Sequence, residues 1–389
     1  MENYDLAIIG AGPAGAALAK ELGLKRKVLL ADARPMQAPL RAFCAAVPTL
    51  RQGEQRAGIQ RYYQEKCCGG LLAPDARQWL SRHGLYLPSS TLDAVQPENL
   101  RALDLGSSLE RVYPTQYINL SRSAFEKWLL SLIPQGVSTL YGHRLKRIEP
   151  EGEGFRLSFS AGNGNAPLEA RCRLLIGADG ANSTVRRFLK RQIRPQAAYL
   201  TVQDTFSAHE AGRIAGPELF QEYTAVFHPE LTDFYGWIIP KGDRIILGLA
   251  LPPQVRESRQ AAAKMRQLKS RLRQAGYDFS GPFQRSGCLL LRPRLGDICM
   301  GGQGAFLIGE AAGWISPSSA EGFSYAFVSA MNLAGAILGN DRPERIMRAY
   351  ALNSLKLRAN IAYKLSKSLI MFSPLARRLI MHSGLLARV

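Results

Sequence analysis

Short, continuous apolar runs alternate with a helix-like segment at the start of the chain. Asp5–Ile9 and Val28–Ala31 have the length of buried strands, and Ala16–Leu24 between them has the composition of a helix. A similar texture returns at Leu174–Ile176 and Ala305–Ile308. Buried strands that alternate with helices are typical of a parallel sheet covered on both faces. The pattern therefore predicts an α/β fold.

The middle of the chain alternates apolar and polar residues instead, as expected for an antiparallel sheet with one covered face. The segments with this alternation are Tyr199–Phe206, Leu219–Phe227, Phe234–Pro240 and Arg244–Leu251. Helices are expected at Asp75–His83, Arg122–Leu132, Arg256–Ala275 and Glu321–Leu338. A β-rich stretch therefore lies between two stretches of α/β texture.

A glycine-rich turn, Gly10–Gly15, follows the first strand directly, and Asp32 ends the second strand. In the dinucleotide-binding fingerprint, a glycine such as Gly10 makes the tight turn, Gly12 lets the backbone approach a pyrophosphate, and Gly15 lets helix and strand pack closely. The N–H groups and dipole of the following helix favour an anion. Asp32 lies 22 positions after Gly10, within reach of ribose hydroxyls. The motif predicts a dinucleotide but does not distinguish FAD from NAD.

The formal charge of +19 over 389 residues is unusual for an enzyme and indicates an anionic surface, polymer or substrate. Nucleic acid is disfavoured because the sequence has no zinc-finger spacing, RNP-like motif or lysine-rich arm. The six cysteines and five histidines have no metal-ligand spacing, so we expect no metal and reduced thiols in a cytosol. The acidic N-terminus argues against a signal peptide, and no apolar run approaches the ~20 residues of a transmembrane helix.

The connection Ala33–Lys66 contains three prolines and has little periodicity apart from a short helix expected near Arg56–Gln64. Connections of this length are usually functional or mobile. Cys67 and Cys68 follow it, and taken alone they are two small buried hydrophobes. The next two residues, Gly69–Gly70, give a backbone that can lie flat against a planar ligand.

Three separated segments combine a strand, glycine and an acid. They are Gly10–Gly15 with Asp32, Gly177–Gly180 with Asp179, and Gly309–Gly313 with Glu310. Together they resemble the three FAD signatures of the para-hydroxybenzoate hydroxylase-like flavoproteins, and the resemblance extends from Met1 to about Gly339. It implies a Rossmann-like FAD-binding domain with an interleaved antiparallel β-sheet domain, which forms the substrate chamber, and FAD as the cofactor.

Within this superfamily the chain resembles the geranylgeranyl reductase family, in particular its bacterial members of the colicin M resistance type. Cys68–Ala76 is similar to the CGGLLAPDA segment beside the flavin ring, and Tyr235–Pro240 resembles the YxWxFP motif that lines the prenyl pocket. Arg122 lies in a segment like RxxFDxxL, although Glu126 stands where Asp is usual. Ile239 replaces the usual Phe, which brings the motif nearer to the WxWxIP of flavin-dependent halogenases.

The resemblance implies a set of site residues. The implied FAD contacts are Gly10, Gly12, Ala14, Gly15, Asp32, Cys68, Gly69, Arg122, Leu145, Asp179, Glu310, Gly322 and Phe323. The implied substrate-lining residues are Tyr235, Trp237 and Pro240. Cys68, or water held near it, is the candidate proton donor. Glu310 would accept from the ribityl chain, and Gly322 would present a helix N-terminus to the anionic flavin.

The resemblance also suggests domain boundaries. The FAD-binding domain is expected to comprise residues 1–75, 100–185 and 295–341, and the substrate domain residues 76–99 and 186–294. Residues 342–389 are expected to form basic amphipathic C-terminal helices.

The implied activity is reduction of carbon–carbon double bonds in a polyprenyl lipid, with NADPH or another external donor supplying electrons to FAD. Two alternatives stay open: an aromatic monooxygenase or halogenase on the same fold, and a non-catalytic, FAD-stabilised resistance or interaction protein. The sequence does not specify the lipid, the number of bonds reduced or the oligomeric state.

From Arg342 onward the chain carries ten Lys or Arg residues and one acid. Apolar residues recur there at helical spacing, namely Leu355, Leu357, Ile361, Leu365, Leu369, Ile370 and Met371. A helix packed on the FAD-binding domain with a solvated basic side is one interpretation. Because the implied substrate resides in a bilayer, we instead expect a cytoplasmic protein that binds peripherally to the anionic inner face of the cytoplasmic membrane.

Overall fold

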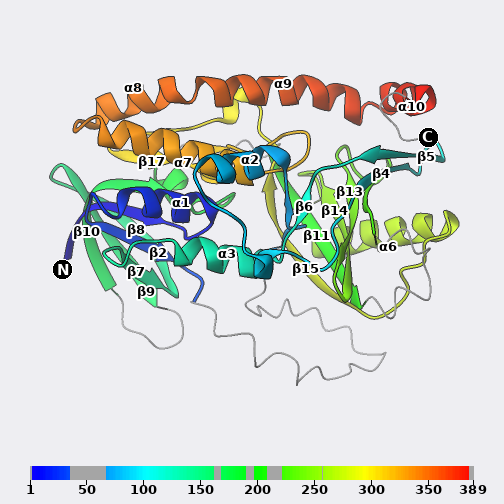
Figure 1. The fold of residues 1–389 in the computed structure, drawn as a ribbon, viewed down its shortest axis with the longest axis horizontal. Helices are drawn as coiled ribbons and strands as arrows, with labels where there is room; N and C mark the ends of the chain where they lie inside the picture. The colour runs from blue at the N-terminus through cyan, green and yellow to red at the C-terminus, as the bar shows by residue number, and fades with distance from the viewer. Residues whose placement is uncertain are drawn as a thin grey trace.

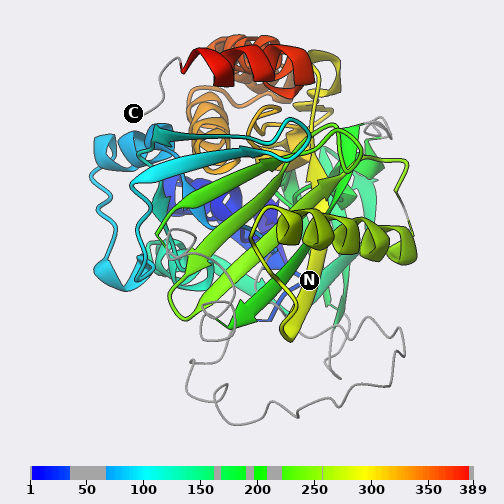
Figure 2. The ribbon, with the colours of Figure 1, turned by 90° about the vertical axis from the view of Figure 1, so that its right-hand side faces the viewer.

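The computed structural model describes residues 2–35, 67–161, 168–189, 197–207, 221–255 and 257–384. They form two large sheets that lie beside one another, with a layer of C-terminal helices extending across both (Figures 1 and 2). The short helix expected near Arg56–Gln64 lies outside the described residues.

The first sheet has eight strands, six of them in the order β16-β17-β10-β1-β2-β7. Their bounds are β1 Glu2–Ile9, β2 Val28–Asp32, β7 Ser138–Tyr141, β10 Leu168–Gly177, β16 Gly301–Gly302 and β17 Ala305–Leu307. From β17 to β7 the neighbours pair in parallel, which confirms the predicted α/β class. β8 (His143–Glu151) and β9 (Gly154–Ala161) extend the sheet from β10 as an antiparallel meander.

Helices α1 (Pro13–Leu22) and α7 (Phe323–Leu338) pack against one another over one face of this sheet (Figure 1). Helices α2 (Pro74–Arg82) and α3 (Arg122–Ser131) contribute to the same apolar core. The opposite face packs against β8, β9 and the short helix α4 (Thr184–Phe188). Successive residues of β1 alternate between the two cores, so that strand is buried on both sides as its apolar run predicts.

The second sheet has seven strands in the order β15-β11-β14-β13-β12-β4-β5. Their bounds are β4 Asn99–Asp104, β5 Leu109–Pro114, β11 Ala198–Ser207, β12 Tyr223–Phe227, β13 Gly236–Lys241, β14 Arg244–Leu251 and β15 Phe283–Leu291. One face is covered by α6 (Ser258–Gln274), which lies across the strands in Figure 2. The other face carries a cluster of aromatic side chains and is turned toward the first sheet's loops. A smaller sheet pairs β3 (Leu71–Leu72) with β6 (Ile118–Asn119).

Two segments lie in a different part of the fold from the expected boundaries. Residues 100–114 are expected in the FAD-binding domain, but β4 pairs in parallel with β12 and so extends the second sheet. Residues 76–82 are expected in the substrate domain, but Ala76 and Leu80 of α2 are buried in the core that contains α1 and α7. Both differences arise from contacts between segments that are distant in the chain, strand pairing for β4 and helix packing for α2, which local patterns do not encode.

Short 3-10 helices complete the described elements at Ser89–Thr91, Leu295–Asp297 and Gly309–Ala312. The C-terminal helices are α8 (Pro343–Asn353), α9 (Leu355–Phe372) and α10 (Pro374–Ser383). Figure 1 shows α8 and α9 running end to end across the molecule, with α10 next to the second sheet. Among the described helices, none combines the length and the apolar composition that crossing a bilayer requires.

The apolar residues of α9 do not form the single face that their spacing suggests. Leu357 and Ile361 are buried against the first sheet's cluster, whereas Leu355, Leu369 and Ile370 are exposed. The helix therefore has apolar residues on two opposite sides. One side packs on the protein, and the other faces outward.

A buried ion pair holds α10 on the second sheet. Arg377 donates from Nε to the Oδ2 atom of Asp104 at 2.6 Å, and both side chains are less than a tenth exposed. The guanidinium also lies 4.6 Å from the centre of the Phe227 ring. Because α10 follows α9 directly, this contact connects the outer helices to β4.

We expect Arg377→Met to lower the free energy of unfolding by about 3–5 kcal/mol, because it leaves the Asp104 carboxylate buried without its cation. Urea denaturation followed by circular dichroism measures the loss. Arg378→Met is the matched control, since Arg378 is exposed and we expect its replacement to change stability little. Equal denaturation midpoints for the two variants would contradict the anchoring role.

Candidate functional site

The glycine-bearing segments meet at one edge of the first sheet, where β1, β10 and β17 end. A Cβ atom added to Gly10, whose φ is +106°, would lie 2.4 Å from the carbonyl oxygen of Ala178. A Cβ added to Gly309, whose φ is +55°, would lie 2.9 Å from the Cβ of Ala14. Such distances exclude a side chain at either glycine, so glycine lets these three segments approach one another closely.

The turn at the start of α1 combines close packing with open space. A Cβ on Gly15 would lie 1.9 Å from the carbonyl oxygen of Gly10, whereas a Cβ on Gly12 would have no atom of the described residues within 4 Å. Gly12 is the N-cap of α1, and no described side chain caps this helix or places an acid in its first turn. The helix N-terminus therefore offers backbone N–H groups and a positive dipole end to an anionic ligand.

Asp32 lies at the end of β2, where the fingerprint requires an acid. Its Oδ2 atom accepts from the backbone N–H of Ala11 at 2.7 Å, and its two oxygens also bind the guanidinium of Arg34. Arg34 extends further to Glu126 Oε2 at 2.8 Å. Burial alone would lower the pKa of Arg34, but its hydrogen bonds to Asp32 and the charges of both acids outweigh burial and raise it. A ribose on Asp32 would share this carboxylate with Arg34.

Arg122 continues this chain of alternating charges toward Cys68. Its guanidinium binds Glu126 Oε1, with 2.5 Å from Nη2, and its Nη1 lies 3.9 Å from the Cys68 sulfur. The guanidinium is buried and lies 4.6 Å from the centre of the Phe323 ring. Burial opposes its charge, but Glu126 and Cys68 raise the pKa of Arg122. The series Asp32–Arg34–Glu126–Arg122–Cys68 is named here the charge network. The sequence singles out four of its residues, and Arg34 is the link between Asp32 and Glu126.

The two adjacent cysteines face different surroundings. Cys67 lies 3.5 Å from the Thr201 hydroxyl, and the Cys288 thiol donates to the Cys67 carbonyl at 3.2 Å. The hydrogen bond with Cys288, together with burial, raises the pKa of the Cys67 thiol. Cys68 instead accepts from the N–H of Gly70 at 3.4 Å and lies beside Arg122. No disulfide joins these thiols. Cys68 is therefore the one of the pair that faces the predicted flavin-binding groups.

Glu310 of the Gly309–Gly313 segment lies near the Gly177–Gly180 segment. The Glu310 carboxylate accepts from the N–H of Leu291 at 3.0 Å, and its other oxygen would be 4.0 Å from a Cβ on Gly180. Gly322 is the N-cap of α7, and the preceding Glu321 accepts from the N–H and the hydroxyl of Ser324. Burial raises the pKa of Glu321. Glu321 was not among the predicted residues, and its position one residue before Gly322 was the available signal.

An aromatic face lines the second sheet on the side toward these segments. It comprises Tyr199, Tyr223, Phe227, Phe234, Tyr235 and Trp237, with Leu71, Tyr117, Ala320 and Phe372 packed against them. The indole of Trp237 lies on Gly248, where an added Cβ would be 2.1 Å from the ring. The Tyr235 hydroxyl donates to the Ser319 carbonyl at 2.8 Å, and burial raises the pKa of that hydroxyl. Ala320, the next residue, has a φ of +54°, so the loop that leads to Gly322 is held in an uncommon conformation.

A buried lysine connects β13 to the Cys68–Gly70 segment. Lys241 donates to the Asn119 side chain and to the Leu120 carbonyl, and its Nζ would be 2.7 Å from a Cβ on Gly70. Asn119 also donates to the carbonyl of Pro240 at 2.7 Å. Gly69 approaches the same strand, because its Cβ would be 2.4 Å from the Ile239 side chain. The segment expected beside the flavin ring is therefore fixed against the YGWIIP strand.

Two predicted FAD contacts have structural partners of their own. Asp179 accepts from the Ser183 hydroxyl and from the N–H of Thr184 at 2.6 Å, so its carboxylate caps α4. Burial raises the pKa of Asp179. Leu145 is buried in the apolar cluster beneath the sheet, together with Ala31. Their roles toward FAD remain predictions.

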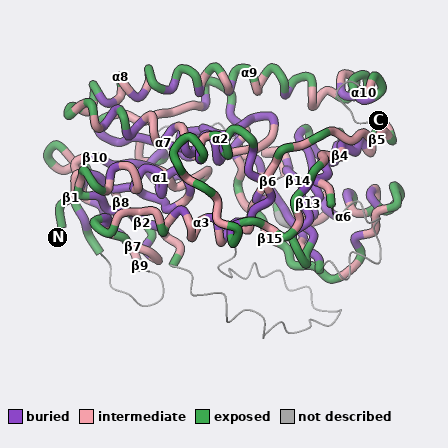
Figure 3. Tube along the Cα trace, in the orientation of Figure 1, coloured by how far each residue is buried: buried purple, intermediate pink, exposed green. Residues whose placement is uncertain are grey.

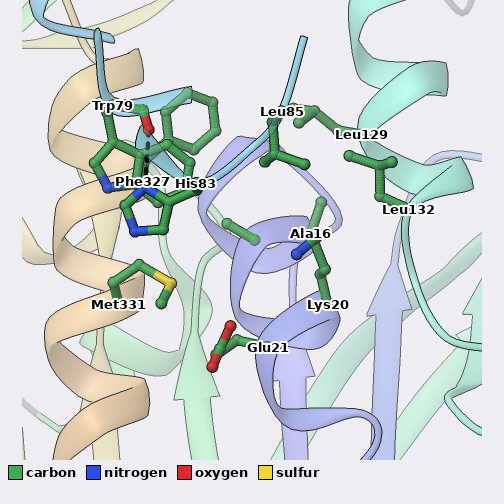
Figure 4. Close-up of a pocket in the computed structure, with 11 residues that line it drawn as sticks. Ala16, Lys20, Glu21, Trp79, His83, Leu85, Leu129, Leu132, Phe327 and Met331 are labelled. Atoms are coloured by element: carbon green, nitrogen blue, oxygen red, sulfur yellow. Dashed lines mark hydrogen bonds between the residues drawn. The ribbon is translucent and has the colours of Figure 1, made fainter. Parts of the chain in front are cut away.

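A separate apolar cavity of about 20 Å³ lies between α1, α2, α3 and α7. Figure 4 shows Trp79, His83 and Phe327 on one side of it and Leu129 and Leu132 on the other. The Trp79 ring stacks 4.7 Å from Phe327 and 4.0 Å from His83. At this size the cavity is a packing defect beside the core, and none of its lining residues belongs to the aromatic face. Among the described residues, no group of three or more His, Cys, Asp or Glu side chains could hold a metal.

The arrangement of these groups fits FAD. The open space over Gly12 and the uncapped start of α1 suit a pyrophosphate, and Asp32 suits a ribose. Glu310 lies where a ribityl chain would run between the second and third segments. Cys68 and Gly322 would then lie near the ring system, beside the aromatic face. In Figure 3 the strands of the second sheet that carry this face are coloured largely as buried.

Comparisons with known proteins agree with this geometry. The family profile described as "FAD binding domain" matches residues 3–351. Protein CbrA of Shigella dysenteriae serotype 1 (strain Sd197) is 36% identical over 388 residues, which cover 99% of this chain and 98% of that protein.

Two solved structures share the architecture at low sequence identity. A geranylgeranyl bacteriochlorophyll reductase-like protein from Thermoplasma acidophilum has a TM-score of 0.73 at 16% identity, covering 96% of this chain and 88% of that one. PqsL, a probable FAD-dependent monooxygenase from Pseudomonas aeruginosa, has a TM-score of 0.65 at 18% identity, covering 98% and 99%. These likenesses confirm the predicted fold and do not decide the reaction.

We expect Gly12→Val to abolish FAD binding while leaving the fold intact, because the new side chain would fill the space over the turn without striking the protein. The flavin absorbance per mole of purified protein measures the loss, and circular dichroism reports the fold. Gly296→Val is the matched control, since an added Cβ there also meets open space but lies outside the three segments. Full flavin content in the Gly12 variant would show that the fingerprint interpretation is wrong.

Proposed function

The chain belongs to the FAD-binding domain family, and from that membership we propose that it is an FAD-dependent oxidoreductase that reduces carbon–carbon double bonds of a polyprenyl lipid. The observation that carries the proposal is the aromatic face, which packs directly against the segment that follows Cys68 and the loop that precedes Gly322. The face consists mainly of aromatic rings, with the guanidinium groups of Arg292 and Arg377 lying over Phe234 and Phe227. Its apolar area suits an isoprenoid chain, whose only recognisable features are apolar area and π-electrons.

Bound FAD in its reduced form supplies the hydride, and the chain's own residues bind the lipid, exclude water and provide the proton. An isolated alkene is a poor hydride acceptor, so the proton must be placed close to the reacting carbon. Cys68 is the proposed donor, either directly or through a water molecule that it holds. It lies between Arg122 and the aromatic face, and its thiol carries no disulfide.

The charge network would position the cofactor and Cys68. Arg122 is buried and held by Glu126 and the Phe323 ring, so its cation is fixed close to Cys68 and to the start of α7. A fixed cation there would favour negative charge on a bound cofactor. We propose NADPH or another external reductant as the electron donor to the cofactor, and we assign it no binding site.

Two other activities are compatible with the same fold: oxygen-dependent hydroxylation or halogenation of an aromatic compound, and a non-catalytic role in which FAD stabilises an interaction protein. The proposed experiment separates all three. The FAD-loaded protein is reduced with dithionite in the absence of oxygen and mixed with a polyprenyl compound, and the return of oxidised-flavin absorbance is followed.

Return of the absorbance without oxygen supports polyprenyl reduction, provided that the fully saturated analogue of the same lipid leaves the flavin reduced. An oxygen-dependent product from an aromatic compound would favour the second activity. No reaction with either compound, in protein that retains its FAD, would contradict both enzymatic proposals.

We expect Cys68→Ser to retain FAD but to slow anaerobic reoxidation by the polyprenyl compound, on the order of 10²-fold, because a hydroxyl is a weaker acid than a thiol. Cys67→Ser is the matched control: Cys67 faces Thr201 and Cys288, so its replacement should leave the rate nearly unchanged. Stopped-flow absorbance measures both rates. Equal rates for the two variants and the parent protein would show that Cys68 is a packing residue.

A further inference from the structure

The outward side of the C-terminal helices exposes large apolar side chains. Among the described residues, fifteen large apolar side chains are exposed, and eight of them belong to α8–α10. They are Leu352, Leu355, Tyr363, Leu369, Ile370, Leu375, Leu379 and Ile380, with exposed fractions from 37% to 77%. This set is named here the outer strip. Figure 3 shows exposed residues along the outward side of α9, and Figure 1 shows that no other described element covers that side.

The exposed residues of α9 that lie between Leu355 and Ile370 on the side of the outer strip carry no charge. On α9 the exposed residues at successive helical spacings are Leu355, Ala359, Ala362, Ser366 and Ile370. A helix side that faces water normally carries charged residues, and a contiguous exposed apolar surface usually marks an interaction site.

Basic residues border the outer strip on α9 and α10. Lys356, Lys367 and Arg378 are exposed beside it, and Arg358 and Lys364 are half-buried. Burial lowers the pKa of Lys367, and the neighbouring charge of Lys364 lowers it further. The segment from Arg342 has ten basic residues and one acid in the sequence. An anionic partner would relieve this repulsion.

The geometry points to an anionic phospholipid bilayer as the partner of the outer strip, with the leucines entering the interface and the flanking lysines and arginines contacting lipid phosphates. An uncharged row between basic borders is the arrangement of helices that lie in the plane of a membrane surface. A second copy of this chain fits less well, because pairing two such strips would bring their basic borders together.

The inner side of the same helices gives this docking a direction. Phe372 at the end of α9 stacks 6.3 Å from Tyr235 and lies 4.9 Å from Phe234, and Met381 of α10 is buried in the aromatic face. One helical layer therefore separates the outer strip from the aromatic face. An isoprenoid chain that leaves the bilayer would have to pass only this layer of helices to reach the aromatic face. The docking itself does not depend on the proposed reaction.

The test is sedimentation of the full-length, FAD-loaded protein with vesicles of phosphatidylglycerol and phosphatidylcholine, compared with phosphatidylcholine alone. We expect binding to the anionic vesicles that weakens at high salt. Leu369→Gln with Leu379→Gln, and separately Lys356→Gln with Lys367→Gln, should each lower the partition coefficient about tenfold or more. All four side chains are exposed, and flavin absorbance verifies that each variant is folded.

Leu24→Gln is the matched control, because Leu24 is 83% exposed but lies outside the C-terminal helices. It should bind vesicles as the parent protein does. Absence of binding to anionic vesicles, or equal binding by the parent and both double variants, would overturn the inference. So would a dimer, seen by sedimentation velocity, that dissociates in the leucine variant. Vesicle binding is measured without turnover, so its failure is distinct from failure of the polyprenyl reaction.

Discussion

Close backbone contact at glycine is the constraint on which the proposed site depends. Gly10 touches Ala178, Gly15 touches the Gly10 carbonyl, and Gly309 touches Ala14, each at a distance that no Cβ atom permits. These contacts bring the ends of β1, β10 and β17 together at one edge of the sheet, although the segments lie up to 300 positions apart in the sequence. A ligand long enough to contact all three segments, such as a dinucleotide, is what this edge can accommodate.

Around that edge, charge and apolar surface are arranged on separate sides. The charge network runs from Asp32 through Arg34, Glu126 and Arg122 to Cys68. It contains two acids and two cations, so the charge of the buried Arg122 is balanced. The aromatic face meets the charge network at the Cys68–Leu71 segment. Lys241 and Ile239 of the second sheet pack against this segment. Cys68 therefore stands at the boundary between a polar half suited to a cofactor and an apolar half suited to an oily substrate.

The parts of this arrangement that were predicted from sequence are those in which chemistry demands particular residues at short spacing. Gly10, Gly12, Gly15 and Asp32 are within one βαβ unit, so their roles follow from local geometry. Arg34 escaped prediction because its importance comes from Glu126, 92 positions away. The pairing of β4 with β12 escaped for the same reason. On α9, apolar residues at two sides of the helix have nearly the same spacing, so only the packing of Leu357 and Ile361 reveals which side faces inward.

The central claim is that this fold places a reduced cofactor and a proton donor next to an isoprenoid double bond. The most direct measurement is the mass spectrum of a polyprenyl lipid recovered after incubation with the FAD-loaded protein and dithionite in deuterated water without oxygen. Both transferred hydrogens exchange with the solvent before transfer, so the account predicts a saturated bond that carries two deuterium atoms. Recovery of the unchanged lipid, or a product that contains added oxygen once air is admitted, would contradict it.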